Sequence, residues 1–294
     1  MSDTKSDTPE RKGDSAIPAE GDAIATALRI QFEHVFGHAR PSDAASSCRR
    51  VALLETPLGP MLAAASDRAV CWLEFARILE PRNMVRPGPV WPSPLSLPFR
   101  KDSKERGAGG ESREGIGITF AAEDDDWSAA RLARELERSR AEMQRRFGVC
   151  VVAGANAVLE RLRVEVRDYF RGKGRAFTVP IEMRGTEFQR RVWDELRRIP
   201  YGTTTSYEAV AKRIGSPTGA RAVARANATN RLCLIVPCHR VIAKNGALSG
   251  YGGGVWRKPL LLELERTGRL PQNATPIKGC RARPPAYAPS RGRC

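Results

Sequence analysis

The stretch Asn230-Arg-Leu-Cys-Leu-Ile-Val-Pro-Cys-His-Arg-Val-Ile242 is the most informative part of this 294-residue chain. Its apolar run, Leu232 to Val236, ends at Pro237, and a Cys-His-Arg triplet follows directly. The thiolate is the reactive form of cysteine, and its pKa falls next to a protonated histidine, an arginine or a helix N-terminus. The sequence therefore indicates a reactive thiol at Cys238, whereas an isolated Cys-His dipeptide would indicate only two core side chains.

A proton relay is expected behind that thiol. Neighbouring side chains of an extended segment point in opposite directions, so we expect His239 to reach Cys238 through a bridging water unless the chain turns. The histidine then needs a carboxylate to orient its ring. Glu263 and Glu265 are both candidates, because Pro259-Leu-Leu-Leu-Glu-Leu-Glu265 predicts a helix.

The residues before this stretch predict three short helices. Thr186 and Ser206 are plausible N-caps for the first two, and Ala220–Ala228 is a third, rich in small residues. Gly215-Ser-Pro-Thr-Gly219 separates the last two, which gives a helix-turn-helix arrangement. Such spacing also occurs in ordinary cores, so it supports DNA contact only together with the charge of the chain.

The N-terminal half predicts a mixed α/β unit. Tight-turn residues separate the three predicted strands, and two amphipathic helices flank one further short strand. The expected strands are Val51–Thr56, Met61–Ala65, Ala69–Phe75 and Val149–Val152, and the expected helices are Trp127–Phe147 and Ala157–Phe170.

Composition sets the remaining boundaries. We expect residues 1–45 to be disordered or vestigial, apart from a short amphipathic helix at Ile24–His38 through Leu28, Phe32, Val35 and Phe36. Residues 77–126, Pro-rich and then Gly- and charge-rich, are expected to be a disordered insertion. The predicted units are an N-terminal α/β domain (46–182), a catalytic DNA-binding domain (183–270) and a disordered basic tail (271–294).

The charge of the chain points to a polyanion. Lys and Arg number 49 against 33 Asp and Glu, which gives a formal net charge of +16. Such an excess favours nucleic acid or an anionic membrane surface as partner. No apolar run approaches the about 18 residues of a membrane span, and the N-terminus lacks a signal-peptide pattern. Nucleic acid is therefore favoured, with cytoplasmic localisation (nucleoid-associated in a bacterium, nuclear in a eukaryote) and no membrane partner.

The cysteines and histidines predict neither disulfides nor metal. The seven cysteines are odd in number and form no CxxC pair, so no disulfide framework is expected. None of the three histidines has a partner at zinc-ligand spacing, so we expect no metal and no cofactor. Apart from Cys238, the cysteines are expected to be structural, in strands (Cys71, Cys150), beside the apolar run (Cys233), or in loops and tails (Cys48, Cys280, Cys294).

The chain resembles the O6-alkylguanine-DNA alkyltransferase family, which includes the C-terminal domain of bacterial Ada proteins. The resemblance is dense from Thr186 to Arg266 and weaker over Leu53–Met61 and Cys71–Phe75. It rests on Phe188-Gln-Arg-Arg-Val-Trp193, Ile199-Pro-Tyr-Gly202, Thr205-Ser-Tyr207, Arg221-Ala-Val223, Asn230, Ile235-Val-Pro-Cys-His-Arg-Val241, Leu248-Ser-Gly-Tyr251 and Leu261-Leu-Glu-Leu-Glu265. It implies a small ribonuclease H-like α/β domain followed by a winged-helix-like helix-turn-helix domain.

The resemblance also implies a reaction. Cys238 would accept the alkyl group of O6-alkylguanine, His239 would be the water-mediated base, and Glu265, preferred to Glu263 by its spacing, would orient the histidine. Asn230 would brace the turn beneath the cysteine. Because the alkylated oxygen is out of reach inside a duplex, the base would have to be flipped out. The thioether has no obvious hydrolytic route, so each molecule would act once, as a monomer on double-stranded DNA.

Further residues would contact the DNA. Arg221 would fill the space of the extruded nucleotide, and Tyr207 would press on the adjacent phosphate. Tyr251 would donate a hydrogen bond to guanine O6, and the carbonyls of Val241 and Cys238 would accept from the guanine amino group. The pocket lid would run from Ser249 to Gly253, with Gly252 where some relatives carry a polar residue. Asn227 occupies a recognition-helix position that is often apolar.

Three other interpretations stay open at this point. A thiol hydrolase would use Cys and His, but its partners come from separate chain segments. A non-catalytic alkylated-DNA-binding relative would keep Arg221 but lack the reactive cysteine. An Ada-like transcriptional regulator would explain the charge and the helix-turn-helix and would leave Pro237–Val241 unexplained. The range of alkyl groups, including that of O4-alkylthymine, cannot be deduced from these residues.

Overall fold

The computed structural model describes residues 20–37, 48–76, 128–248 and 250–271. The predicted insertion (77–126), most of the predicted basic tail and residues 1–19 lie outside the described residues. None of the helices in the described ranges has the length and apolarity that a membrane crossing requires.

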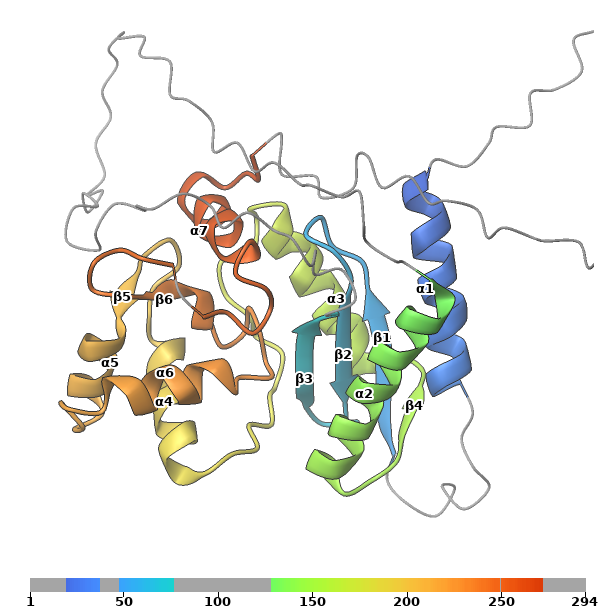
Figure 1. The fold of residues 1–294 in the computed structure, drawn as a ribbon, viewed down its shortest axis with the longest axis horizontal. Helices are drawn as coiled ribbons and strands as arrows, with labels where there is room; N and C mark the ends of the chain where they lie inside the picture. The colour runs from blue at the N-terminus through green and yellow to red at the C-terminus, as the bar shows by residue number, and fades with distance from the viewer. Residues whose placement is uncertain (1–19, 38–47, 77–127, 249, 272–294) are drawn as a thin grey trace, which may run out of the picture.

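A four-stranded sheet forms the centre of the N-terminal half (Figure 1). Its strands are β1 (Arg49–Leu54), β2 (Met61–Ala65), β3 (Val70–Phe75) and β4 (Val151–Ala153), in the order β3-β2-β1-β4. β2 runs antiparallel to β1 and β3, and β4 runs parallel to β1. The predicted strands are confirmed, since short turns connect the first three as the sequence indicated.

Helices cover both faces of this sheet. α1 (Glu20–Phe36) and α2 (Ala129–Phe147) pack on one face in a core with Leu62 and Ala64, while α3 (Ala157–Phe170) packs on the other with Ala63. Successive side chains of β2 therefore enter different cores, as the two-residue period of a strand requires. Both faces are apolar because both are covered.

α1 confirms the amphipathic helix predicted at Ile24–His38. It begins earlier than predicted, at Glu20, within the stretch that was expected to be disordered. Its apolar residues recur every three or four positions, form one stripe and bury that stripe against the sheet and α2. The buried residues are Leu28, Phe32, Val35 and Phe36.

A disulfide between Cys48 and Cys150 corrects a second prediction. The two residues precede paired strands, and the Arg49 N–H donates to the Cys150 carbonyl at 2.9 Å. The parallel pairing of β1 with β4 places their Cα atoms 4.8 Å apart across 102 residues of sequence. Cysteine spacing alone could not predict this pair, because only the tertiary fold brings the two strands together.

The C-terminal half is mainly helical and confirms the predicted caps. Thr186 forms a capping box with Gln189, and the Ser206 hydroxyl accepts from the Ala209 N–H. The helices are α4 (Glu187–Arg197), α5 (Tyr207–Arg213), α6 (Ala220–Ala228) and α7 (Arg257–Thr267). A small parallel pair, β5 (Thr205–Ser206) and β6 (Val241–Ile242), joins the region before α5 to the chain that follows Cys238.

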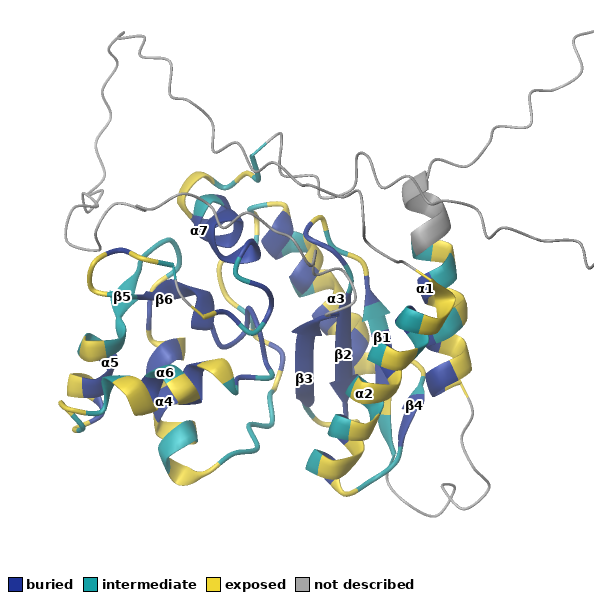
Figure 2. Ribbon diagram, viewed as in Figure 1, coloured by how far each residue is buried: buried dark blue, intermediate teal, exposed yellow. Residues whose placement is uncertain are grey.

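The two halves share one apolar core. β3 ends the sheet, yet it is buried along its whole length (Figure 2), because the C-terminal half covers its edge. Leu73 of β3 donates its N–H to the Arg231 carbonyl and accepts from the Cys233 N–H, each at 2.7 Å. The sheet therefore holds the segment that leads to Cys238.

Candidate active site

Cys238 begins one turn of 3-10 helix, Cys238–Arg240, and only 2% of its surface is exposed. Asn230 braces this turn, because its Nδ2 donates to the Val236 carbonyl at 2.8 Å and to the Cys238 sulfur at 3.2 Å. The chain thus turns at the cysteine and is not extended there. The structure brings Asn230 to the position that the sequence predicted.

The surroundings of Cys238 favour its thiolate. A hydrogen bond from the Cys233 thiol lowers the pKa of Cys238 against the opposing effect of burial, and the Asn230 amide and the positive charge of Lys258 lower it further. A thiolate in a buried site is stable only when such donors and charges surround it. Cys238 is therefore set up as a nucleophile.

Glu265 lies directly behind His239. Its Oε1 is 2.7 Å from His239 Nε2 and accepts from the Tyr169 hydroxyl at 2.8 Å, and its Oε2 accepts from Arg240 Nε at 2.8 Å. Burial raises the pKa of the Glu265 carboxyl, but His239 and Arg240 outweigh it and hold that pKa far below its usual range. Glu263 instead pairs with Arg266 on the exposed side of α7.

His239 is completely buried and neutral. Burial lowers the pKa of its imidazole, although the Glu265 carboxylate opposes the effect. With Nε2 hydrogen-bonded to Glu265, the tautomer assigned from that contact leaves a lone pair on Nδ1. Nδ1 has no hydrogen-bond partner within the described residues. It is the nitrogen that can take up a proton.

Tyr251 and the residues that follow it lie near Cys238. The Tyr251 side chain is buried, and its hydroxyl lacks a hydrogen-bond partner in the described part of the chain. At Gly253 a Cβ atom would lie 2.7 Å from the Tyr251 ring and 2.9 Å from Phe75, so only glycine fits. At Gly252 it would lie 3.5 Å from the Ala228 carbonyl, an ordinary contact. Ser249 lies outside the described residues.

α6 presents Arg221 and Arg225 to the surface, where both are exposed. A hollow of about 290 Å³ lies beside them, between α4 and α6, and is lined in part by Phe188 and Gln189. Tyr207, at the start of α5, is half-buried and hydrogen-bonded to Asn227; burial and the nearby Cys238 charge raise its pKa to about 12.

Asn227, the polar residue at a recognition-helix position that is often apolar, has its side chain buried, with 3% exposed. Its Nδ2 donates to the Cys238 carbonyl at 3.3 Å, and the Val241 N–H donates to the same oxygen. In this structure both lone pairs of the Cys238 carbonyl, one of the two carbonyls expected to accept from the guanine amino group, therefore have a donor.

Four residues of this site were not predicted as functional: Tyr169, Cys233, Arg240 and Lys258. Lys258 is fully buried at the start of α7, and burial lowers its pKa to about 8. Arg257 and Lys258 come directly before the apolar run of α7, so they were candidates for burial with that run. Because charged side chains are rarely buried without a partner, this position was a usable signal of a functional role. Tyr169 gave no signal, since it lies on the predicted apolar face of its helix.

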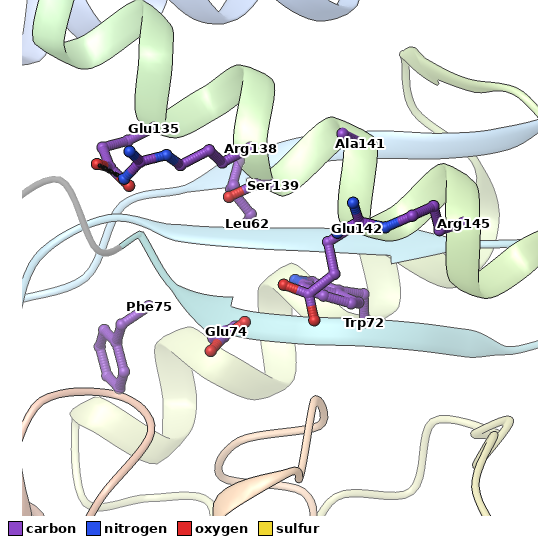
Figure 3. A pocket seen from close by; sticks show the side chains of 10 residues that line it. All are labelled: Leu62, Trp72, Glu74, Phe75, Glu135, Arg138, Ser139, Ala141, Glu142 and Arg145. Carbon is purple, nitrogen blue, oxygen red and sulfur yellow. Dashed lines mark hydrogen bonds and ion pairs between the residues drawn. The ribbon is translucent and has the colours of Figure 1, made fainter.

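A second cavity, of about 320 Å³, lies between α2 and the strands β2 and β3. Figure 3 shows Glu142 of α2 and Glu74 of β3 facing it beside Trp72. Both carboxylates pair with Arg231, at 2.7 Å for Glu74 and 2.5 Å for Glu142, and the Arg231 guanidinium lies 5.2 Å from the centre of the Trp72 ring. The residue after Asn230 is therefore anchored on the N-terminal half.

Comparison with known proteins agrees with this geometry. The family model described as 6-O-methylguanine DNA methyltransferase, DNA binding domain, matches residues 187–267. The methylated-DNA–protein-cysteine methyltransferase of Mycobacterium tuberculosis (strain ATCC 25618 / H37Rv) is 51% identical over 111 residues, which are 38% of this chain and 67% of that protein. The inducible enzyme of that name from Bacillus subtilis (strain 168) is 46% identical over 123 residues, 42% of this chain and 69% of that protein.

A solved structure, the crystal structure of Mycobacterium tuberculosis OGT in complex with DNA, is similar with a TM-score of 0.49 and 29% identity. It covers 77% of this chain and 98% of that chain. A buried cysteine with a lowered pKa, together with a helix-turn-helix that exposes two arginines, is the arrangement expected of a DNA-modifying thiol protein. Within that class, the chain belongs to the methylated-DNA–protein-cysteine methyltransferase family. The resemblance seen in the sequence is confirmed.

Proposed function

We propose that Cys238 is the residue that accepts the alkyl group from O6-alkylguanine in duplex DNA. The chain is a methylated-DNA–protein-cysteine methyltransferase by family, and the protein therefore repairs DNA by alkyl transfer to one of its own cysteines. One observation carries the choice of cysteine. Of the three free cysteines in the described residues, Cys238 is the one that accepts a hydrogen bond from Asn230 and directly precedes the His239–Glu265 pair, and its pKa alone is lowered.

The proton of Cys238 passes through water to Nδ1 of His239, and Glu265 holds the ring and stabilises the imidazolium. The sulfur then attacks the alkyl carbon in one SN2 step. The carbon–sulfur bond forms as the carbon–O6 bond breaks, the electron pair leaves with the guanine, and the guanine anion takes up the proton that the His239 imidazolium returns through water. Tyr251 supports the departing oxygen by donating its hydroxyl proton in a hydrogen bond. The thioether is not reversed, so each molecule acts once.

The DNA side of the proposal rests on α6. The lesion base leaves the stack, at a cost of a few kcal/mol, and the exposed Arg221 fills the gap. Tyr207 lies beside the adjacent phosphate, the Val241 carbonyl accepts from the guanine amino group, and residues 249–253 close the pocket. In this proposal the protein works as a monomer on double-stranded DNA, in the compartment that holds the DNA.

The finer fold description belongs to the same proposal. Residues 46–182 form a ribonuclease H-like domain, and residues 183–270 form a winged-helix-like domain. The mixed sheet with helices on both faces supports the first, and the helix-turn-helix of α5 and α6 with its small parallel pair supports the second.

Mass spectrometry tests the acceptor. After incubation with a duplex that contains O6-methylguanine, the tryptic peptide Leu232–Arg240 should gain one methyl group on Cys238. Cys238→Ala should gain none. Cys71→Ala, which removes a buried thiol whose pKa burial raises to about 12, is the matched control and should still be methylated. A methyl group on another cysteine, or unchanged mass with the lesion intact, would overturn the proposal.

A further inference from the structure

The site contains a second thiol that alkyl transfer does not use. Cys233 is 1% exposed and belongs to the same apolar cluster as Cys238. Its backbone N–H donates to Leu73 of β3 at 2.7 Å, which fixes its position against the sheet. The chain then reverses direction, with Leu234 in the left-handed region at φ 70° and the Ile235 N–H donating to the Cys233 carbonyl at 2.9 Å. This reversal brings Cys238 back beside the segment of Cys233, because the Asn230 side chain accepts from the Leu232 N–H at 2.9 Å and donates to the Cys238 sulfur at 3.2 Å.

The two sulfurs differ in protonation. The hydrogen bond between them raises the pKa of Cys233 well above its usual value, with burial adding to the effect, and lowers that of Cys238. Cys238 is thus the thiol of the pair that ionises more readily, and Cys233 is the one that keeps its proton. A thiolate is the species that peroxides oxidise, and a neighbouring thiol can resolve the sulfenic acid that forms.

We propose that Cys233 and Cys238 form a reversible redox modification site, which a hydroperoxide closes to an intramolecular disulfide. The Cys238 thiolate attacks one oxygen of the peroxide, whose O–O bond breaks, and the products are a sulfenic acid and hydroxide, which takes up a proton to become water. The Cys233 sulfur then attacks the Cys238 sulfur, the S–O bond breaks, and the thiol proton leaves with the oxygen as a second water. In total, two thiols lose two electrons and two protons, and one peroxide becomes two waters.

The geometry permits closure. A disulfide bond is about 2.05 Å long, and forming it requires a local shift of the turn that joins the two cysteines. The residues between the two cysteines lie in turns and not in a helix or strand, so they can accommodate that shift. Cys71, by contrast, donates its thiol to the Ala64 carbonyl at 3.3 Å within the other core of the sheet. It is not placed to resolve Cys238.

Disulfide closure would keep the acceptor from irreversible oxidation. Without Cys233, the sulfenic acid of Cys238 would proceed to the sulfinic acid, which ordinary thiols do not reduce. A dithiol reductant would reopen the disulfide by exchange and restore both thiols. The chemistry of closure is independent of alkyl transfer, while its consequence for repair rests on the proposed function.

Peptide mapping of the full chain tests this proposal. Cleavage after Arg231 and Arg240 releases Leu232–Arg240, which contains Cys233 and Cys238 and no other cysteine. Treatment with hydrogen peroxide should make this peptide lighter by two hydrogen atoms and resistant to iodoacetamide, and dithiothreitol should reverse both changes. Gain of oxygen on Cys238 with Cys233 still open to alkylation would overturn the proposal. So would an unchanged peptide at peroxide concentrations that oxidise a free low-pKa thiol.

Two variants sharpen this experiment. In Cys233→Ala and Cys233→Ser, the same treatment should add two oxygen atoms to Cys238, and methyl acceptance should stay lost after dithiothreitol. Wild type and Cys71→Ala should regain their initial methyl acceptance. Equal recovery in all four proteins would exclude a protective role for Cys233. If a variant fails to fold, the wild-type map still decides whether closure occurs, and it requires no alkylated DNA.

Discussion

Cys71 and Cys238 are the same side chain, buried to nearly the same extent in the two halves of one molecule. Burial raises the pKa of Cys71 to about 12, whereas the pKa of Cys238 is lowered. Their hydrogen bonds run in opposite directions. Cys71 donates to the Ala64 carbonyl at 3.3 Å, which favours the thiol, and Cys238 accepts from Asn230 at 3.2 Å, which favours the thiolate.

The difference shows that burial by itself makes a thiol inert. The core around Cys71 is built from apolar residues of β1 to β4, α1 and α2, and the nearby charges of Arg49, Glu182 and Arg184 have opposing effects that burial outweighs. The site around Cys238 instead buries the charged groups of Arg240, Lys258 and Glu265 together with the neutral imidazole of His239, and each of them has partners. Reactivity therefore comes from polar groups that the fold brings into an apolar interior.

Removing the charge of Glu265 should have the largest effect on the difference in reactivity between Cys238 and Cys71. In Glu265→Gln, His239 loses the carboxylate that orients it, and alkyl transfer should slow by about 10²–10⁴-fold, the usual contribution of general base catalysis. Stability should fall by roughly 3–5 kcal/mol, because buried Arg240 keeps its charge without a full partner. Single-turnover kinetics with a methylated duplex and chemical denaturation measure the two losses.

Glu263→Gln is the matched control on the same helix. Its carboxylate pairs with Arg266 near the surface, so its loss should change stability by no more than about 0.5 kcal/mol and leave the rate unchanged. Similar losses in both variants would contradict the special role of Glu265.

Lys258 should make stability depend on pH. Its pKa is lowered from 10.5 to about 8 in the folded protein, so between these values the unfolded chain holds a proton that the folded one lacks. The loss of folding stability caused by burying the Lys258 charge is fully present below pH 8, and it disappears as pH rises toward 10.5. Relative to Lys258→Met, the free energy of unfolding of wild type should therefore rise by about 3 kcal/mol over that range. Chemical denaturation at pH 8 and at pH 10.5 measures this rise. If the free energies of unfolding of the two proteins changed equally with pH, the pKa of Lys258 would not be lowered.

Arg221→Ala should separate DNA handling from thiol chemistry. Without the Arg221 side chain in the gap, the unstacked duplex loses about 1.4 kcal/mol of stabilisation, and repair in a duplex should slow by about tenfold. Reaction with free O6-benzylguanine needs no unstacking and should keep its rate, because Arg221 is exposed on α6 and is not among the groups that shift the pKa of Cys238. Arg225→Ala is the control from the same helix. Equal losses with both substrates would contradict the role of Arg221 in the base stack.

Local patterns allowed much of this to be predicted from the sequence. The caps at Thr186 and Ser206 and the extent of α6 follow from residues a few positions apart, whereas the choice of Glu265 over Glu263 came from the family resemblance. Contacts between distant segments could not be predicted. Asn227 turns inward because the Cys238 turn packs beneath α6, and Cys48 meets Cys150 because β1 pairs with β4.

The smallest expected effect concerns Cys71 itself. Cys71→Ala removes one buried sulfur and should cost about 1 kcal/mol of stability, since a cavity of that size remains in the core. Alkyl transfer should be unchanged, because Cys71 lies in the core shared with α1 and α2 and makes no contact with the groups that activate Cys238. Quenched-reaction kinetics with a methylated duplex measure the rate, with wild type and variant compared at equal concentrations of folded protein. A slower rate in this variant would mean that the apolar core of the sheet influences the reactivity of Cys238 through Leu73 and Cys233. Local surroundings alone would then not explain the difference between the two thiols.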